Sequence, residues 1–167
     1  MKKSRKKLTL WALGHSNRPF EVFLEMLKEA GIQTLVDIRT VPRSRAVPWT
    51  SQENLKPALK KARIHYVHMK ILGGLRKTIP DSKNLYWRNA SFRGYADYMQ
   101  TEDFERGLAE LLEIAAKNKT AFMCAEAVPW RCHRSLVADA LTARGHTVLQ
   151  LYSPGRAQPH EFTLMGK

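Results

Sequence analysis

Short apolar runs alternate with helical stretches along the whole of this chain, and few folds accommodate such an alternation. Runs of strand length are predicted as strands and lie at Leu8–Leu13, Thr34–Ile38, His65–Leu72, Thr120–Cys124 and Thr147–Leu151. Strands separated by helices imply β-α-β units, in which the strands are parallel and helices cover both faces of the sheet. The sequence therefore predicts an α/β fold with a mostly parallel five-stranded sheet, a Rossmann-like three-layer sandwich.

The intervening segments have the periodicity of helices. Phe20, Phe23, Leu24 and Leu27 recur at helical spacing after Pro19, and Gly31 is a natural helix end. Further helices are predicted at Gln52–Ala62, Glu102–Ala116 and Cys132–Arg144. Residues 76–94 have no periodicity, and we expect a long loop that serves a function or moves, with Phe92 and Tyr95 packed in the core at the start of a helix.

Polar residues follow four of the predicted strands. Ligands of parallel sheets bind beyond the carboxyl ends of the strands, so we expect these residues to converge on one edge. They are His15, Ser16 and Asn17 after the first strand, Asp37 and Arg39 at the end of the second, Gly73 and Gly74 after the third, and the segment 124–134 after the fourth.

The segment 124–134 carries most of the candidate chemistry. Cys132, His133 and Arg134 open a predicted helix, where free N–H groups and the helix dipole favour an anion. Arg131 and Arg134 add donors suited to phosphate or carboxylate. A thiol in such surroundings has a lowered pKa, so either Cys124 or Cys132 is a candidate nucleophile, with His133 or His15 as its base.

Other interpretations of these residues stay open. Cys124 at the end of a core strand is also what simple packing would produce. Six residues separate Cys124 from Arg131, where the phosphatase signature loop has five, and no glycine eases the turn. Cys124, Cys132, His133 and His15 could surround zinc, but no C-x-x-C pair is present and we expect no metal. Asp37 and Arg39 either pair with each other or leave Arg39 for the anion.

The net charge of +13 favours anionic partners. The basic N-terminal tail, residues 1–7, supplies five of these charges and leaves +8 for the predicted single domain, residues 8–167. Basic and aromatic residues also interleave, which is typical of surfaces that bind nucleic acid. They are Arg43, Arg45 and Trp49, and then Tyr86, Trp87, Arg88, Phe92, Arg93 and Tyr95.

A cytoplasmic location is expected. The chain has two cysteines, too few for a disulfide framework, and no apolar run approaches the roughly 20 residues that span a bilayer. The first residues have a basic start and a short apolar stretch, but no small-residue cleavage site follows, so we expect no signal peptide and no membrane partner.

Several motifs together resemble a known family. They are GHS at 14–16, VDIR with Pro-Arg-Ser at 36–44, LGG at 72–74, FRGYADYM at 92–99, PHEF at 159–162 and C-A-E-x-x-P-x-x-C-H-R at 124–134. The chain resembles the bacterial and archaeal proteins of the domain-of-unknown-function family DUF488 over almost its whole length. The resemblance implies a compact α/β domain and a shared signature of Cys124, Glu126, Pro129, Cys132, His133 and Arg134. It implies no reaction.

The sequence therefore predicts a basic Cys/His/Arg pocket with two functions left open. The first is an enzyme acting on a phosphate-bearing substrate, a nucleotide or nucleic acid; the second is a non-catalytic module that binds nucleic acid or another anion. The candidate catalytic residues are His15, Cys124, Glu126, Cys132 and His133. The candidate anion-binding residues are Ser16, Asn17, Arg39, Arg131 and Arg134. The two cysteines could also form a redox-responsive pair. The sequence identifies no cofactor and no oligomeric state.

Overall fold

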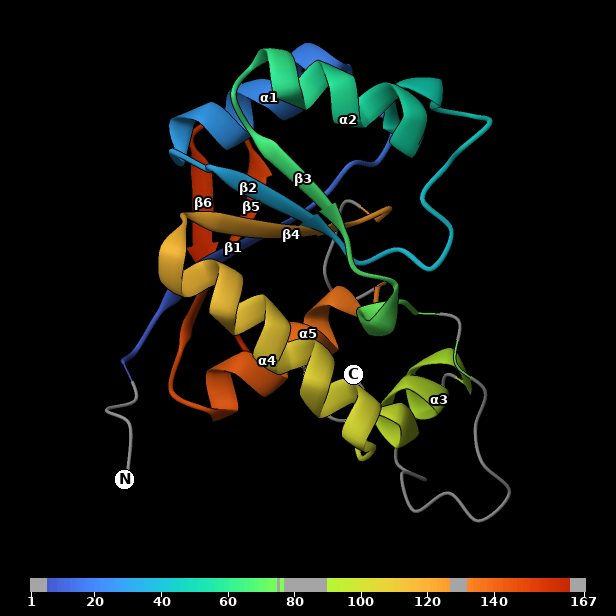
Figure 1. Cartoon of the computed structure of the whole chain (residues 1–167), viewed down its shortest axis with the longest axis vertical. Helices are drawn as coiled ribbons and strands as arrows, with labels where there is room; N and C mark the ends of the chain where they lie inside the picture. The colour runs from blue at the N-terminus through green and yellow to red at the C-terminus, as the bar shows by residue number, and fades with distance from the viewer. Residues whose placement is uncertain (1–5, 75, 77–89, 127–131, 163–167) are drawn as a thin grey trace.

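A six-stranded sheet forms the centre of the protein (Figure 1). The computed structural model describes residues 6–74, 76, 90–126 and 132–162. The strands lie in the order β3-β2-β4-β1-β5-β6, with the first five parallel and β6 antiparallel to β5. Their bounds are β1 Thr9–Gly14, β2 Thr34–Asp37, β3 His65–His68, β4 Thr120–Cys124, β5 Thr147–Ser153 and β6 Arg156–Pro159.

The central strands are buried on both faces. Every residue of β2 and of β4 is buried, as expected for parallel strands covered by helices on either side. Successive side chains alternate between the two faces: Leu35 and Met123 belong to one hydrophobic cluster, whereas Val36 and Phe122 belong to the other.

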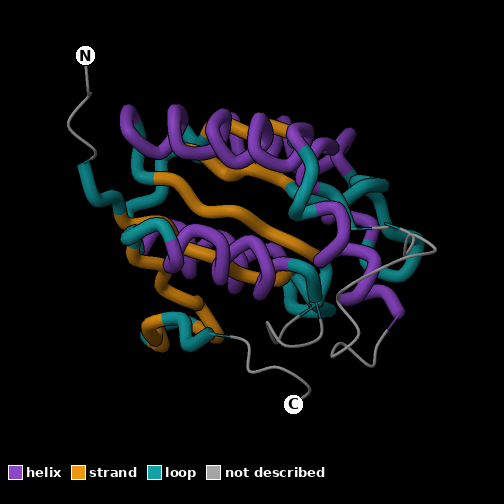
Figure 2. The backbone as a smooth tube through the Cα atoms, turned by 90° about the horizontal axis from the view of Figure 1, so that it is seen from below, coloured by secondary structure: helices purple, strands orange, loops and turns teal. Residues whose placement is uncertain are grey.

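Helices form the two outer layers. Helices α1 (Phe20–Glu29) and α2 (Gln52–Lys61) cover one face, and α4 (Glu102–Lys117) and α5 (Arg134–Ala143) cover the other, with α3 (Ala90–Tyr98) beside them (Figure 1). The view from the side of α4 and α5 shows helices lying in front of the strands (Figure 2). The predicted three-layer α/β sandwich is thus confirmed.

The chain crosses the sheet in two directions. From β1 to β2 to β3 it moves toward one edge with its helices on one face, and from β3 to β4 to β5 it returns with its helices on the other face. Right-handed crossovers require this change of face when the direction reverses. Consequently the connection after β4 leaves on the face opposite to the connections after its neighbours β1 and β2.

The structure corrects three details of the sequence prediction. The sheet has a sixth strand, β6, because the chain folds back at Gly155, whose positive φ suits a tight turn. The third strand ends at His68, and Lys70–Leu72 forms the short 3-10 helix η2 instead. Part of the predicted loop 76–94 is helical, since α3 begins at Ala90; residues 77–89, which include Tyr86, Trp87 and Arg88, lie outside the described residues.

Helix α3 is anchored to η2 by two tyrosines. The hydroxyl of Tyr95 donates to the carbonyl of Leu72 at 2.8 Å, and that of Tyr98 donates to the carbonyl of Ile71 at 2.6 Å. Tyr95 is 1% exposed, which confirms its predicted place in the core. The side chain of Phe92 is outside the described part of the chain.

Candidate functional site

A cavity of about 330 Å³ lies at the carboxyl end of β4. The connections that leave β4 and its neighbours to opposite faces open a crevice there, which is where ligands bind in open parallel sheets. Residues from the ends of β1, β2 and β4 and from the start of α5 meet in it. The described lining residues are His15, Arg39, Thr40, Val41, Arg43, Ser44, Gly74, Cys124, Ala125, Cys132 and His133.

Cys124 and Cys132 lie together in this cavity although they come from different elements. Cys124 is the last residue of β4 and Cys132 stands two residues before α5; both are free thiols and both are buried. The two thiol groups are neighbours, and their interaction lowers the pKa of Cys124 and raises that of Cys132. The guanidinium of Arg134, which is 0% exposed, donates from Nη1 to Cys124 Sγ at 3.3 Å and to the carbonyl of Glu126 at 2.9 Å.

These contacts make the two thiols chemically unequal. Burial by itself would raise the pKa of Cys124, but the hydrogen bond from Cys132 and the positive charge of Arg134 outweigh it and lower that pKa to about 7. Burial and the neighbouring Cys124 sulfur raise the pKa of Cys132. Cys124 is therefore the thiolate of the pair and Cys132 its hydrogen-bond donor.

His133 supports Cys132 and is neutral. Its Nε2 donates to the carbonyl of Ile38 at 2.9 Å, so Nδ1 carries the lone pair and lies 3.4 Å from Cys132 Sγ, as a second acceptor for the single proton of that thiol. Burial, reinforced by the charge of Arg134, lowers the pKa of His133 to about 4. The imidazole is therefore an uncharged neighbour of the Cys132 sulfur.

His15 carries an imidazole nitrogen with no partner. Its Nδ1 donates to the carbonyl of Ser16 at 2.8 Å, and its Nε2 is buried without a hydrogen bond among the described residues. Burial lowers the pKa of His15, so Nε2 has a free lone pair at neutral pH. The ring also packs edge-on against Trp49, with centroids 6.2 Å apart.

Hydrogen bonds occupy two nitrogens of the Arg39 guanidinium and leave the third, Nη1, as a donor. Its Nε and Nη2 bind the buried carboxylate of Asp37 at 2.9 Å and 2.7 Å, and Nη2 also donates to the carbonyl of Thr50 at 2.7 Å. Nη1 is buried and has no partner among the described residues. Both sequence alternatives for Arg39 are thus compatible, because the pairing with Asp37 leaves one nitrogen for a ligand.

Among the described residues, three buried polar atoms of this one cavity have no hydrogen-bond partner: His15 Nε2, Arg39 Nη1 and Thr40 Oγ1. An unsatisfied buried polar atom costs about 1–3 kcal/mol, so these three atoms are available to a bound molecule or to water in the cavity. The described lining also contains two arginines and no carboxylate, and the third arginine, Arg134, lies directly behind Cys124.

Close approach of the backbone shapes the cavity. A Cβ on Gly14, the last residue of β1, would lie 1.5 Å from the carbonyl oxygen of Glu126. A Cβ on Gly74 would lie 2.9 Å from Nδ1 of His133. Glycine at these positions lets the ends of β1 and of η2 close around the cysteines.

Some predicted site residues lie elsewhere. Ser16 and Asn17 do not line the cavity; the amide of Ser16 donates to the carbonyl of Ala125 at 2.8 Å, and its hydroxyl faces Asn17. The side chain of Glu126 is exposed, and its contribution to the described site is its carbonyl oxygen. Arg131 and Pro129 lie outside the described residues.

Sequence reasoning did not single out Thr40 and Ser44 as site residues. Thr40 follows directly on the strand-end motif VDIR, and Ser44 lies in the loop after it. Their position after a strand end was the sequence signal that could have marked them as site residues. Arg43, expected on a nucleic-acid surface, lines the cavity. Trp49 packs against Phe23, with centroids 5.1 Å apart, and its indole N–H donates to the carbonyl of Arg18 at 3.0 Å.

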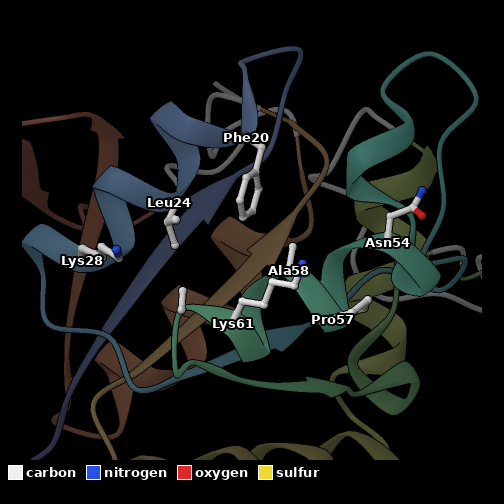
Figure 3. Close-up of a pocket in the computed structure, with 8 residues that line it drawn as sticks. Phe20, Leu24, Lys28, Asn54, Pro57, Ala58 and Lys61 are labelled. Carbon is white, nitrogen blue, oxygen red and sulfur yellow. The ribbon is translucent and has the colours of Figure 1, made fainter.

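A second cavity of about 470 Å³ lies between α1 and α2 (Figure 3). Phe20, Leu24 and Ala58 make its surface apolar, and Lys28 and Lys61 add positive charge. Its described lining contains no Cys, His, Asp or Glu, and the two lysines are its titratable groups.

The described ranges contain neither a cluster of metal-ligating side chains nor a membrane-spanning helix. No group of three or more His, Cys, Asp or Glu side chains there is arranged to hold a metal ion. Within the same ranges, no helix combines the length and the apolar character that crossing a bilayer requires.

Fold and site together define an α/β protein with a pocket at the carboxyl edge of a parallel sheet, lined by two free thiols and two arginines. The chain belongs to the family described as domain of unknown function DUF488, whose model matches residues 19–141. The match begins after His15 and contains the cysteines, His133 and Arg134, and it confirms the resemblance seen in the motifs. No curated protein and no solved structure matches the chain.

Proposed function

We propose that the protein is an enzyme that binds a small phosphate-bearing substrate in the cavity at the end of β4 and attacks it with Cys124. One observation carries the proposal: a buried thiol with a lowered pKa shares a cavity with three polar atoms that lack partners. A thiolate repels anions, so a site built only to bind them gains nothing from it. A nucleophile beside anion-binding groups fits chemistry on an anionic substrate.

Arg39 and Arg43 are assigned to the phosphate. Arg39 Nη1 is already oriented by the contacts of Nε and Nη2 with Asp37, so little side-chain freedom is lost when it binds an oxyanion. Arg43 is an exposed residue that lines the same cavity, and it adds a second charge at the entrance side. The cavity has room for a small molecule rather than a polymer segment.

Cys124 and His15 are assigned to the reaction. The Cys124 sulfur forms a bond to the electrophilic centre of the substrate, and the leaving group departs with its electron pair. A water molecule that gives a proton to Nε2 of His15 then displaces the Cys124 sulfur and releases product. The neutral His15, with its Nε2 lone pair free, is suited to accept that proton.

Calorimetric titration with inorganic phosphate, together with hydrolysis of a chromogenic aryl phosphate, tests the proposal. Arg43→Gln should weaken phosphate binding several-fold, because a rim charge contributes about 1 kcal/mol. Arg45→Gln is the matched control, since Arg45 is exposed in the same loop and does not line the cavity. Cys124→Ser should retain binding and lose turnover.

Equal phosphate affinity in Arg43→Gln and Arg45→Gln, or full turnover in Cys124→Ser, would refute the proposal. Short DNA that binds tightly, competes with phosphate poorly and dissociates when residues 1–7 are removed would favour the alternative, a non-catalytic nucleic-acid-binding module. We place the enzyme in the cytoplasm, because a reducing compartment keeps two such thiols free.

A further inference from the structure

Cys124 and Cys132 meet the requirements of a redox pair. Both line one cavity, and they lie close enough for each to shift the pKa of the other. Each is held by a different group: Arg134 Nη1 lies 3.3 Å from Cys124 Sγ, and His133 Nδ1 lies 3.4 Å from Cys132 Sγ. Two thiols that merely filled core space would need neither contact.

From this geometry we propose that the protein reduces hydrogen peroxide, with Cys124 as the attacking thiolate and Cys132 as the resolving thiol. The oxidant must be small, because Cys124 is 0% exposed and lines a cavity of about 330 Å³. Arg39 Nη1 and the hydroxyl of Thr40 belong to residues that line the same cavity, have no partner within the described part of the chain, and can hydrogen-bond the peroxide oxygens.

The reaction balances in three steps. The Cys124 thiolate attacks one peroxide oxygen, the O–O bond breaks, and the departing hydroxide takes a proton to become water, which leaves Cys124 as a sulfenic acid. The sulfur of Cys132 then attacks that of Cys124, and the hydroxyl group leaves with the thiol proton as a second water, which forms the Cys124–Cys132 disulfide. A dithiol reductant donates two electrons and two protons and returns both thiols.

The polar contacts assign the two roles. Arg134 stabilises negative charge on Cys124, and the pKa of that thiol is lowered to about 7, so about half of it is thiolate at neutral pH. An ordinary thiol with a pKa of about 8.5 is roughly 3% ionised there, so Cys124 carries on the order of fifteen times more of the reactive form. Cys132 stays protonated beside it and is held by neutral His133 until the sulfenic acid appears.

The test treats the full chain with hydrogen peroxide and follows free thiols and intact mass. The chain has two cysteines and six methionines, so the count of free thiols and the trap for sulfenic acid distinguish cysteine oxidation from methionine oxidation. Wild type should lose both thiols and two hydrogen atoms, and recover both with dithiothreitol. Cys132→Ser should gain one oxygen as a sulfenic acid that a carbon nucleophile traps, and Cys124→Ser should oxidise at least tenfold more slowly. Arg45→Gln serves as the control and should behave as wild type.

Wild type that keeps both thiols in excess peroxide, or Cys124→Ser that oxidises as fast as Cys132→Ser, would overturn this proposal. The proposal shares its nucleophile with the phosphate reaction but does not depend on phosphate binding. Disulfide formation in a protein without phosphate affinity would leave the redox pair standing and refute the phosphate site alone; the converse result would refute the redox pair alone.

Discussion

Removing the thiol of Cys132 should raise the pKa of Cys124 by one to two units. Cys124 is fully buried, and burial alone would push its pKa above the ordinary value of 9.0; the thiolate exists near pH 7 because Cys132 and Arg134 donate to it. A hydrogen bond to a charged group contributes about 1.5–3 kcal/mol, and one pKa unit corresponds to about 1.36 kcal/mol. Cys132→Ala should therefore move the pKa of Cys124 from about 7 to about 8–9.

Cys132→Ser is the matched control for this change. The serine hydroxyl keeps a donor at the same place, so the pKa of Cys124 should stay near its wild-type value. Each variant retains one thiol, so the ultraviolet absorbance of the thiolate, followed against pH, reports on Cys124 alone. Urea unfolding of both variants checks that they fold.

Equal titration midpoints in Cys132→Ala and Cys132→Ser would refute the reasoning, because the hydrogen bond from Cys132 would then contribute nothing to the thiolate. A higher pKa of Cys124 in both variants would show that a serine hydroxyl does not replace the Cys132 thiol as hydrogen-bond donor. A rise in Cys132→Ala alone assigns the lowered pKa to that bond, with Arg134 responsible for the remainder.

Three further outcomes are expected in urea unfolding. Gly14→Ala should lower the free energy of unfolding by more than about 3 kcal/mol, because its Cβ would lie 1.5 Å from the carbonyl oxygen of Glu126; a smaller loss would show that β1 and the end of β4 can separate. Burial lowers the pKa of His133 from 6.5 to about 4, so its contribution is complete above pH 6.5 and is lost as the pH falls toward 4. Wild type should therefore lose about 3 kcal/mol more than His133→Gln between pH 7 and pH 4, and parallel pH profiles would contradict this. Thr101→Ala should cost about 1 kcal/mol, since its side chain accepts the amide of Phe104 at 3.2 Å at the start of α4; an unchanged midpoint would mean that water replaces the cap.

The three-layer α/β architecture could be predicted from the sequence because apolar runs and helical periodicity are local patterns. The continuous apolar runs at β2 and β4 have the length and composition of buried parallel strands, and the predicted bounds of β4 agree with the structure. β6 was missed because all four of its residues are exposed, so no apolar pattern marks it. The strand predicted through Leu72 was too long, since an apolar residue in η2 looks the same in sequence as one in a strand.

For the site, the convergence of strand ends was predictable and the individual contacts were not. The topology brings His15, Arg39 and Cys124 together, as the rule for parallel sheets requires. Which atoms remain unpaired depends on side-chain geometry: no sequence pattern shows that Asp37 occupies two nitrogens of Arg39 and leaves the third. Nor does any sequence pattern show that the backbone amide of Ser16 donates to the carbonyl of Ala125.

The place of β4 in the sheet has a consequence for the order in which the molecule forms. β4 lies between β1 and β2, so neither of those strands has the other as a neighbour. During synthesis on the ribosome, β1, β2 and β3 emerge long before residues 120–124, and β1 then lacks both of its partners, because β5 follows later still. The nascent N-terminal half therefore cannot complete its sheet, and the strand that inserts to complete it is the one that carries Cys124.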